Sequence, residues 1–393
     1  MDMAKPKIRF KGYTDDWEQR KLEDLVDRVT RKNQDLVSEL PLTISAQYGL
    51  IDQNEFFDKR VASKDVSGYY LIENGEFAYN KSTSTDAPWG AVKRLDRYEN
   101  GVLSTLYIVF GIKKNNPVDS DFLVSYYSTN LWHKGIHEIA AEGARNHGLL
   151  NIAPADFFET ELTIPQDIEE QKKIGKYFEE LERLITLHQR KCEETKKLKK
   201  YMLQKMFPQN GQTVPEIRFA GFTDAWEQRK LGEIAIEILA GGDIDKEKVV
   251  DDGTYPIYAN ALTNDGIVGY YNDYYRVKAP AVTVTGRGEV GHAQARMTDF
   301  TPVVRLLAIR SNHDCYFLEN AINNQNVVVE STGVPQLTVP QLSSYDICFP
   351  KDIREEEKIG AYYKKLDNLI TLHQHKCEQL QSMKKFMLQN MFV

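Results

Sequence analysis

Two segments of this chain occur twice, and this internal duplication constrains the fold more than any other feature of the sequence. Residues 8–22 return as residues 217–231, at an offset of 209, and 12 of these 15 positions are identical. Residues 165–207 return as residues 350–392, at an offset of 185. Repeats of this length do not arise by chance, so we expect one structural frame that is built twice along the chain.

Each copy of the longer repeat is predicted to form one long helix. After the opening Pro165 or Pro350 it has no proline, and it is rich in Glu, Lys, Leu, Gln and Met, which favour helices. Apolar residues recur every seven positions over about 40 residues, and Asp167 and Asp352 are suited to cap the helix start. Such a helix is not stable alone in water, so we expect the two copies to pair. We favour an antiparallel coiled coil, because a parallel pair needs the intervening chain to fold back along the helix.

The segments between the repeats, residues 23–148 and 232–333, show no obvious similarity to each other. Closely similar frames around unlike inserts suggest one scaffolding role carried out twice and two different recognition roles. We therefore predict an α+β fold with pseudo-two-fold symmetry, in which two mixed α/β domains are joined by the two antiparallel helices. The predicted parts are a first domain, a first helix, a second domain and a second helix, at residues 1–165, 166–208, 209–350 and 351–393.

Composition excludes several classes of protein. The net charge of −7, with no broadly basic segment, excludes a protein that binds nucleic acid through charge alone. No run of about 18 apolar residues occurs, and the first residues lack the apolar stretch of a secretory signal. We therefore expect a cytoplasmic protein with no membrane partner. The four cysteines have no CxxC spacing, which excludes a disulfide scaffold and the usual zinc modules.

The common catalytic motifs are absent from the sequence. It has no GxxxxGK phosphate loop followed by Ser or Thr, no HExxH and no GxSxG. Residues 286–291 match GxGxxG, but the segment that follows is too short for the helix that a dinucleotide site requires. We interpret these glycines as a strand-turn-strand corner that carries Arg287. We predict that the chain is not an enzyme and holds no cofactor of its own.

One pattern in the long repeat allows two interpretations. His188 and Cys192 lie one helical turn apart, and His373 and Cys377 repeat this spacing. In an antiparallel pair these four side chains could meet as a zinc site. The interpretation we favour is a polar layer that sets the register of the coiled coil, so we predict no metal.

Together these features closely resemble the specificity subunit of type I restriction-modification systems, over nearly the whole chain. The resemblance rests on the Arg-Phe-x-Gly-aromatic-Thr-Asp-x-Trp-Glu segments that begin at Arg9 and Arg218, and on both helical repeats. It also rests on residues 331–350, which begin Ser-Thr-Gly-Val-Pro-Gln-Leu-Thr and end at Pro350. The first copy departs from this last pattern, with Arg-Asn-His at residues 145–147 where the second copy has Glu-Ser-Thr.

The resemblance implies a function in DNA recognition. Each insert would be a target-recognition domain that reads one half of a split, asymmetric site in double-stranded DNA. The paired helices would set the gap between the half-sites and dock two modification subunits, which bind S-adenosylmethionine and methylate adenine. Restriction subunits that use ATP and Mg²⁺ could join the complex. The alternative from another class is a two-headed protein-interaction scaffold without catalytic activity.

Candidate base-reading residues follow from side-chain chemistry. Base edges are read by Arg, Lys, Asn, Gln, Ser and Thr at the ends of strands and in loops. In the first domain the candidates gather around residues 79–84, 93–94 and 145–146, and in the second they lie at separate positions between residues 260 and 336. The predicted nucleic-acid-binding residues are Asn80, Lys81, Ser82, Thr83, Lys93, Arg94, Arg145, Asn146, Asn260, Thr283, Thr285, Arg287 and Gln336.

Overall fold

A computed structural model describes most of the chain, which divides into two compact units. Unit 1 comprises Met1–Leu187 with Lys376–Val393, and unit 2 comprises His188–His375. The unit boundaries cut both long helices, whereas the four parts predicted from the repeats keep each helix whole; that division stays a prediction. The described residues are 5–45, 48–85, 87–115, 118–140, 145–146, 149–209, 211–261, 263–325 and 335–393.

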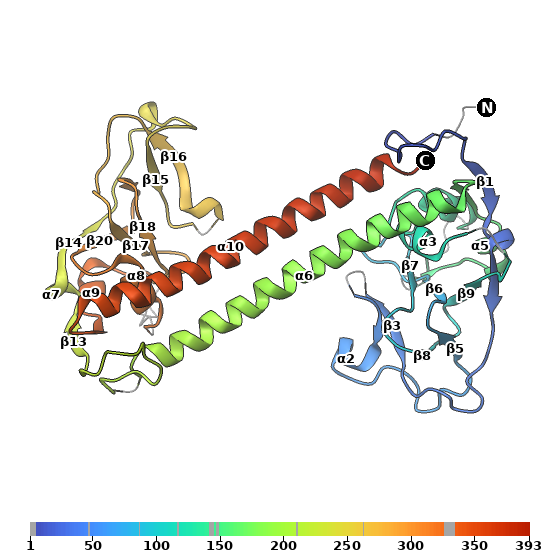
Figure 1. Cartoon of the computed structure of the whole chain (residues 1–393), viewed down its shortest axis with the longest axis horizontal. Helices are drawn as coiled ribbons and strands as arrows, with labels where there is room; N and C mark the ends of the chain where they lie inside the picture. Colours follow the sequence, from blue (N-terminus) through green and yellow to red (C-terminus); the bar gives the residue numbers. More distant parts are fainter. Residues whose placement is uncertain are drawn as a thin grey trace. The chain divides into compact units, whose positions relative to one another are not determined.

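The two long helices form where the repeat predicts them (Figure 1). Helix α6 spans Ile168–Met206 and α10 spans Ile353–Asn390. The predicted caps are confirmed, because the Asp167 carboxylate accepts a hydrogen bond from Glu169 N at 2.8 Å and the Asp352 carboxylate accepts one from Arg354 N at 3.0 Å. In the described part of the chain, no helix is both long and apolar enough to cross a membrane.

Within each unit the segments of α6 and α10 run antiparallel. In unit 1 the ring of Phe178 lies 5.7 Å from that of Phe392, and Glu182, further along α6, pairs with Lys384, earlier on α10. In unit 2 His188 contacts His373, and further along α6 Lys199 pairs at 2.6 Å with Asp367, earlier on α10. In both units, residues further along α6 contact residues that come earlier on α10. This order of contacts confirms the predicted antiparallel coiled coil.

Each unit contains one four-stranded antiparallel sheet, and the two sheets have the same strand order. In unit 1 the order is β2-β9-β6-β7 and in unit 2 it is β14-β20-β17-β18. The first unit's strands are Val26–Val29, Ile108–Ile112, Phe77–Asn80 and Ala91–Arg94, in sheet order. The second unit's strands are Ala235–Ala240, Leu306–Ser311, Ala281–Thr285 and Ala293–Arg296, in sheet order. The inserts, which show no similarity in sequence, therefore share the topology of their central sheet.

Shorter elements surround these sheets. The repeated frame supplies β1 (Glu18–Lys21) paired with β12 (Glu161–Ile164), and β13 (Glu227–Lys230) paired with β21 (Asp346–Phe349). The other described strands of unit 1 are β3 (Leu42–Ser45), β4 (Gly49–Asp52), β5 (Tyr70–Glu73), β8 (Asn100–Leu103), β10 (Arg145–Asn146) and β11 (Leu149–Leu150); those of unit 2 are β15 (Tyr255–Tyr258), β16 (Ile267–Tyr271) and β19 (Thr301–Pro302). The short helices are α1 (Leu22–Leu25), α2 (Gln53–Phe57), α3 (Ser120–Tyr126), α4 (Trp132–Ile139), α5 (Pro154–Phe158), α7 (Leu231–Ile234), α8 (Cys315–Asn323) and α9 (Val339–Ser343).

The repeated frame attaches to the long helices through the same contacts in both units. Arg9 forms two hydrogen bonds with the buried Glu170, at 2.6 and 2.8 Å, and Arg218 forms two with the buried Glu355, at 2.6 and 2.7 Å. The backbone repeats too, because Ile8 N donates to the Asn390 carbonyl and Ile217 N donates to the Lys205 carbonyl, both at 2.9 Å. These contacts fix the start of each shorter repeat, at residues 8–9 and 217–218, against the long helices.

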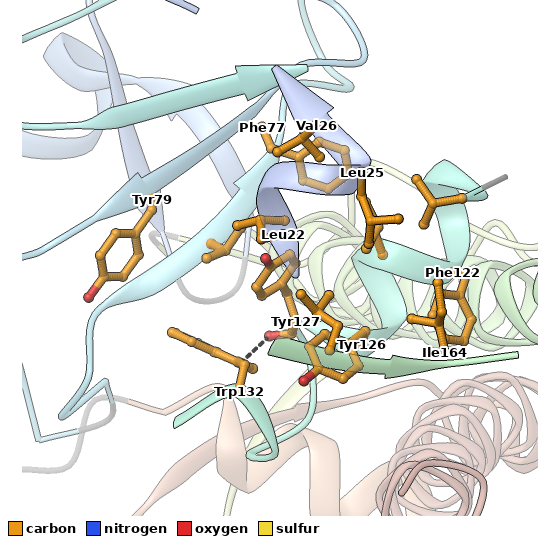
Figure 2. Packing of buried hydrophobic residues seen from close by; sticks show 14 of the residues in the cluster. Leu22, Leu25, Val26, Phe77, Tyr79, Phe122, Tyr126, Tyr127, Trp132 and Ile164 are labelled. Carbon is orange, nitrogen blue, oxygen red and sulfur yellow. Dashed lines mark hydrogen bonds between the residues drawn. The ribbon is translucent and has the colours of Figure 1, made fainter. Parts of the chain in front are cut away.

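The core of unit 1 lies between its sheet and the helices that cover it. Figure 2 shows Phe77 of β6 beside Val26 of β2, and the ring of Tyr79, also on β6, lies 6.1 Å from that of Trp132 on α4. The Trp132 indole donates a hydrogen bond to the Tyr127 carbonyl at 3.2 Å, so its polar edge is satisfied within the core. Unit 2 has a corresponding core around Trp226, Phe317 and Phe349.

The single glycine of each long helix admits a second helix. A Cβ at Gly175 would lie 2.6 Å from the backbone nitrogen of Phe122 in α3. A Cβ at Gly360 would overlap the carboxylate of Asp314, which caps α8 by accepting a hydrogen bond from Phe317 N at 2.8 Å. Both glycines therefore allow the first turn of a domain helix to pack directly against a long helix.

Candidate nucleic-acid interface

The candidate loops of the two units occupy equivalent positions. Residues 81–90 connect β6 to β7, and residues 286–292 connect β17 to β18, so both loops join the same two strands of the shared sheet. Each loop is held by a strand segment that precedes a short helix. Leu150 N donates to the Lys81 carbonyl at 3.0 Å, and Leu337 N donates to the Gly286 carbonyl at 2.9 Å.

In unit 1 the first candidates form a polar turn. Asn80, at the end of β6, accepts a hydrogen bond through its side chain from Ser82 N at 3.0 Å, and Lys81 Nζ lies 3.4 Å from the Ile152 carbonyl. Ser82 is exposed, while Asn80 and Thr83 are half-buried. The turn thus presents hydroxyl and amide groups of the kind that read base edges.

This turn lines a groove of about 520 Å³. Polar groups of Asn80, Ser82, Thr83 and Ser84 form part of its lining, and the aromatic rings of Phe56 and Phe57 on α2 form another part. The two phenylalanines are 49% and 44% exposed, and their ring centroids lie 4.9 Å apart. These two rings carry no sequence signal, because nothing in the sequence distinguishes an exposed phenylalanine from a core one.

Lys93 and Arg94 do not join this turn. Arg94 forms ion pairs with Asp96 at 2.6 Å and Asp121 at 2.7 Å, so its guanidinium fastens β7 to α3. Lys93 lies near the ion pair of Lys384 and Glu182 on the long helices; burial, and next the charge of Lys384, lower the pKa of its amine. Their role in base reading stays a prediction. In this structure Arg94 is paired with two carboxylates, and Lys93 lies beside an ion pair of the long helices.

Arg145 and Asn146 form β10, which pairs with β11. Their side chains lie outside the described part of the structure, as do Ser331, Thr332 and Gly333 of the segment that supports the resemblance. Their predicted roles are therefore neither strengthened nor weakened by the geometry.

In unit 2 the glycine-rich segment is a hairpin turn between β17 and β18. Strand β18 stands where a dinucleotide-binding site needs a helix, so the interpretation as a strand-turn-strand corner is confirmed. Arg287 is exposed on this turn, and Asn260 supports it: the Asn260 side chain accepts from Gly286 N at 2.9 Å and donates to the Val304 carbonyl at 3.1 Å.

Thr283 and Thr285 lie inside the hairpin. Their residues are 2% and 6% exposed. The Thr283 hydroxyl accepts a hydrogen bond from Arg296 Nε at 3.1 Å, and the Thr285 hydroxyl accepts one from His292 N at 2.9 Å. In this arrangement the two hydroxyl groups support the turn and do not reach solvent.

Gln336 is exposed beside the same turn, and its side-chain partner is Arg305, which is not among the predicted residues. Arg287 and Gln336 form an isolated antiparallel β-bridge, and Arg305 Nη1 donates to Gln336 Oε1 at 3.2 Å. Arg305 has a positive φ of 71°, which is uncommon for a residue with a long side chain. No sequence signal marks such a residue, because the conformation is imposed by the turn around it.

The histidines of the long repeat meet within unit 2. His188 Nδ1 lies 3.0 Å from His373 Nδ1, and Cys192 is buried with its sulfur 4.0 Å from the Ile370 carbonyl. Among the residues that the structure describes, no three His, Cys, Asp or Glu side chains are grouped to hold a metal ion. The contact between the rings is compatible with the polar layer favoured above.

Comparisons with known proteins agree with this architecture. The family model described as type I restriction modification DNA specificity domain matches residues 14–197 and 223–382. Two Mycoplasma pneumoniae proteins named as type I specificity subunits are related in sequence. S.MpnORF507P is 25% identical over 271 residues, which are 67% of this chain and 69% of that protein. S.MpnORF285P is 25% identical over 147 residues, which are 34% of this chain and 47% of that protein.

The crystal structure of a type I restriction-modification S subunit from M. genitalium has a similar fold. Its TM-score is 0.68 at 14% sequence identity, and the match covers 99% of both chains. The family model matches each half of the chain once and spans most of its length. This chain therefore belongs to the family of type I restriction-modification DNA specificity proteins, whose members recognise DNA sequences and are generally not catalytic.

Proposed function

We propose that this chain is the DNA-recognition subunit of a type I restriction-modification complex and that each unit reads one half of a bipartite, asymmetric site. The observation that carries this proposal is the shared sheet, which presents its β6–β7 or β17–β18 loop at the same position in both units. The loops differ in chemistry: Asn80 to Ser84 offer amide and hydroxyl groups, and the second loop offers Arg287. Equivalent positions with unlike side chains fit two readers of different base sequences.

In this proposal the partner subunits carry out catalysis and make most of the contacts to DNA phosphates. A net charge of −7 is unsuited to holding a phosphate backbone, whereas a few exposed polar side chains are sufficient for reading base edges. The chain itself is not catalytic. S-adenosylmethionine is bound by the modification subunits, and ATP and Mg²⁺ by restriction subunits where these take part.

Two equivalent apolar surfaces on the long helices fit the docking of two modification subunits. On α6, Leu198 and Tyr201 are 44% and 50% exposed; on α10, Met383 and Phe386 are 49% and 54% exposed. The second pair repeats the first at the offset of 185, and spacing of three residues puts each pair on one helix face. Exposed Tyr, Phe, Met and Leu at fixed spacing are typical of helix-in-groove interfaces. We propose that each pair contacts one copy of the same subunit.

The helices also determine the spacing of the half-sites in this proposal. A helix is a stiff element that rises 1.5 Å per residue, so its length limits how many base pairs can remain unread between the two readers. The same continuous helices α6 and α10 contribute to both units.

Genome-wide mapping of methylated adenine tests the proposal. The cognate modification subunits would be expressed with and without this chain in a host that lacks other adenine methylation. We expect one split motif that depends on the chain. Exchange of residues 232–333 for the corresponding insert of another specificity subunit should change one half of the motif and leave the other half intact. Methylation that is independent of the chain, together with stable binding of a protein lacking methyltransferase activity, would favour the scaffold instead.

A further inference from the structure

Three segments of unit 2 meet beside the β17–β18 turn. The Gly286 carbonyl accepts a hydrogen bond from Leu337 N at 2.9 Å, and Arg287 lies opposite Gln336 in a β-bridge. The third segment is the turn between β19 and β20, from which Arg305 Nη1 reaches Gln336 Oε1 at 3.2 Å. Two arginines and a glutamine are therefore gathered around one short strand segment.

The backbone of Arg305 is held in an unfavourable conformation. Its φ of 71° lies in the left-handed region, which a residue with a Cβ adopts only at a free-energy cost. The turn is fixed from two sides: Asn260 donates to the Val304 carbonyl at 3.1 Å, and the missing Cβ of Gly286 leaves room for the Arg305 carbonyl. A glycine would adopt this φ without strain, so the arginine side chain must contribute something that offsets the cost.

The remaining arginines of this sheet have other partners. Arg296 is 5% exposed, stacks 3.7 Å from the centre of the Tyr258 ring and pairs with Asp265 at 2.8 Å. Arg310 lies 3.7 Å from a Glu237 oxygen. By contrast, within the described part of the chain neither Arg287 nor Arg305 has a carboxylate at ion-pair distance. Their charges are therefore available to a ligand.

The chemistry of the three side chains selects among the bases. A guanidinium group donates two parallel hydrogen bonds to O6 and N7 of guanine in the major groove, and this is the commonest specific contact to DNA. The bond from Arg305 to the Gln336 amide oxygen uses one donor, orients the guanidinium plane and leaves the other donors free. The Gln336 amide nitrogen can donate beside it.

We propose that Arg305, oriented by Gln336 and accompanied by Arg287, reads a guanine in the half-site bound by unit 2. This inference rests on the proposed function, and it deepens it by naming a base and by adding Arg305, a residue that carries no sequence signal. Arg305 contacts the base, and Gln336 and Asn260 position it.

The test uses the full-length chain assembled with its modification subunits. Once the methylated motif is mapped, binding is compared for duplexes in which each guanine of one half-site is replaced by 7-deazaguanine or by inosine. 7-Deazaguanine lacks the N7 acceptor, whereas inosine keeps both N7 and O6. We expect 7-deazaguanine at one position to weaken binding by about 10- to 100-fold and inosine there to have little effect.

Substitutions connect this loss to Arg305. Arg305→Ala should reduce discrimination at that guanine by about 10- to 100-fold, make 7-deazaguanine harmless there and leave the other half-site unchanged. Arg305→Gly should lose the same discrimination and also raise the melting temperature, because it removes the left-handed strain. Lys248→Ala, which removes an exposed cation of the same unit outside the three segments, is the matched control and should change neither.

Several outcomes would overturn the inference. The inference is wrong if the half-site that changes in the 232–333 exchange contains no guanine. It is also wrong if Arg305→Ala weakens binding to all DNA sequences to the same degree, because a phosphate contact behaves in that way. Arg305→Gly that retains full discrimination would also contradict it. Failure of the proposed function looks different, because no split motif would then depend on the chain at all.

Discussion

Substitution of Gly360 by alanine tests how the domains are joined to the long helices. By helix propensity alone, Gly→Ala within a helix stabilises by about 1 kcal/mol. Here the added Cβ would overlap the Asp314 carboxylate and lie 3.0 Å from Phe317 N. Overpacking costs about 1–3 kcal/mol, and displacement of a helix cap costs about 1 kcal/mol more. The net expectation is a destabilisation of about 1–3 kcal/mol, opposite in sign to the propensity.

The equivalent substitution in unit 1 should be at least as costly. A Cβ at Gly175 meets backbone atoms, Phe122 N at 2.6 Å and Asp121 C at 2.7 Å, and backbone yields less readily than a carboxylate. Ala361→Gly, one residue along α10 and exposed, isolates the propensity effect and should destabilise by about 1 kcal/mol.

Calorimetry of the full chain measures these effects. For a unit of this size, a change of 1 kcal/mol shifts the melting temperature by about 2–4 °C, so losses of about 2–12 °C are expected. Gly175→Ala should lower the transition of unit 1, and Gly360→Ala that of unit 2. If Gly360→Ala instead raised the melting temperature, while Ala361→Gly lowered it, propensity would dominate and the close packing argued here would be refuted.

Three further predictions follow from particular contacts. Burial raises the pKa of Glu319 to about 7 from its usual 4.5, while the Lys199 charge lowers it and the Asp367 charge raises it again. Because this carboxyl binds its proton more tightly when folded, stability is lost as pH rises from about 4.5 to 7, by up to about 3 kcal/mol. Glu319→Gln should therefore stabilise unit 2 in urea unfolding at pH 8 and have little effect at pH 4; equal effects at both pH values would contradict the burial argument. Insertion of four residues after Leu187 and after Leu372 should lengthen the unread spacer of the methylated motif by one or two base pairs, because four helical residues add about 6 Å and a base pair occupies about 3.4 Å; an unchanged motif would exclude the helices as the determinant of spacing. Serine at Leu198 and Tyr201 should remove one of two bound modification subunits, as measured by native mass spectrometry, and serine at Met383 and Phe386 should remove the other; full occupancy in both double variants would exclude these surfaces.

The long helices are predictable from sequence because their signals are local and repeated. The heptad spacing and the lone glycines lie within the helices, and the caps at Asp167 and Asp352 immediately precede them. The antiparallel pairing follows from the position of the inserts. The sheet is different: its strands are only four to six residues long, and β2 pairs with β9 some 80 residues later, as Val26 does with Ile112. No local pattern specifies such a pairing, and the shared topology therefore stays hidden in the sequence.

The candidate site also has features that the sequence predicts and features that depend on contacts between distant segments. The corner that carries Arg287 is predictable, since glycines at a strand end favour a turn. Thr283 and Thr285 have suitable side chains for base reading, but neighbouring strands decide that they are buried. Arg94 likewise has a suitable charge, but its guanidinium forms ion pairs with Asp96 and Asp121, and the pair with Asp121 depends on the packing of β7 beside α3. Chemistry can be assigned from sequence, whereas exposure depends on contacts between distant segments.

The contacts within the frame, and those that join it to the inserts, suggest why the duplicated parts have stayed alike while the inserts have not. Each unit combines two contacts whose loss is costly: a bidentate pair with a buried carboxylate, such as Arg9 with Glu170, and a helix glycine that tolerates no side chain. Substitution of one partner leaves a buried charge or a steric overlap, so these positions cannot drift singly. An insert needs only to supply the four-stranded sheet and one capped helix that fits the glycine. Its loops are otherwise unconstrained by the frame, and that freedom is what allows two readers of different chemistry to share one scaffold.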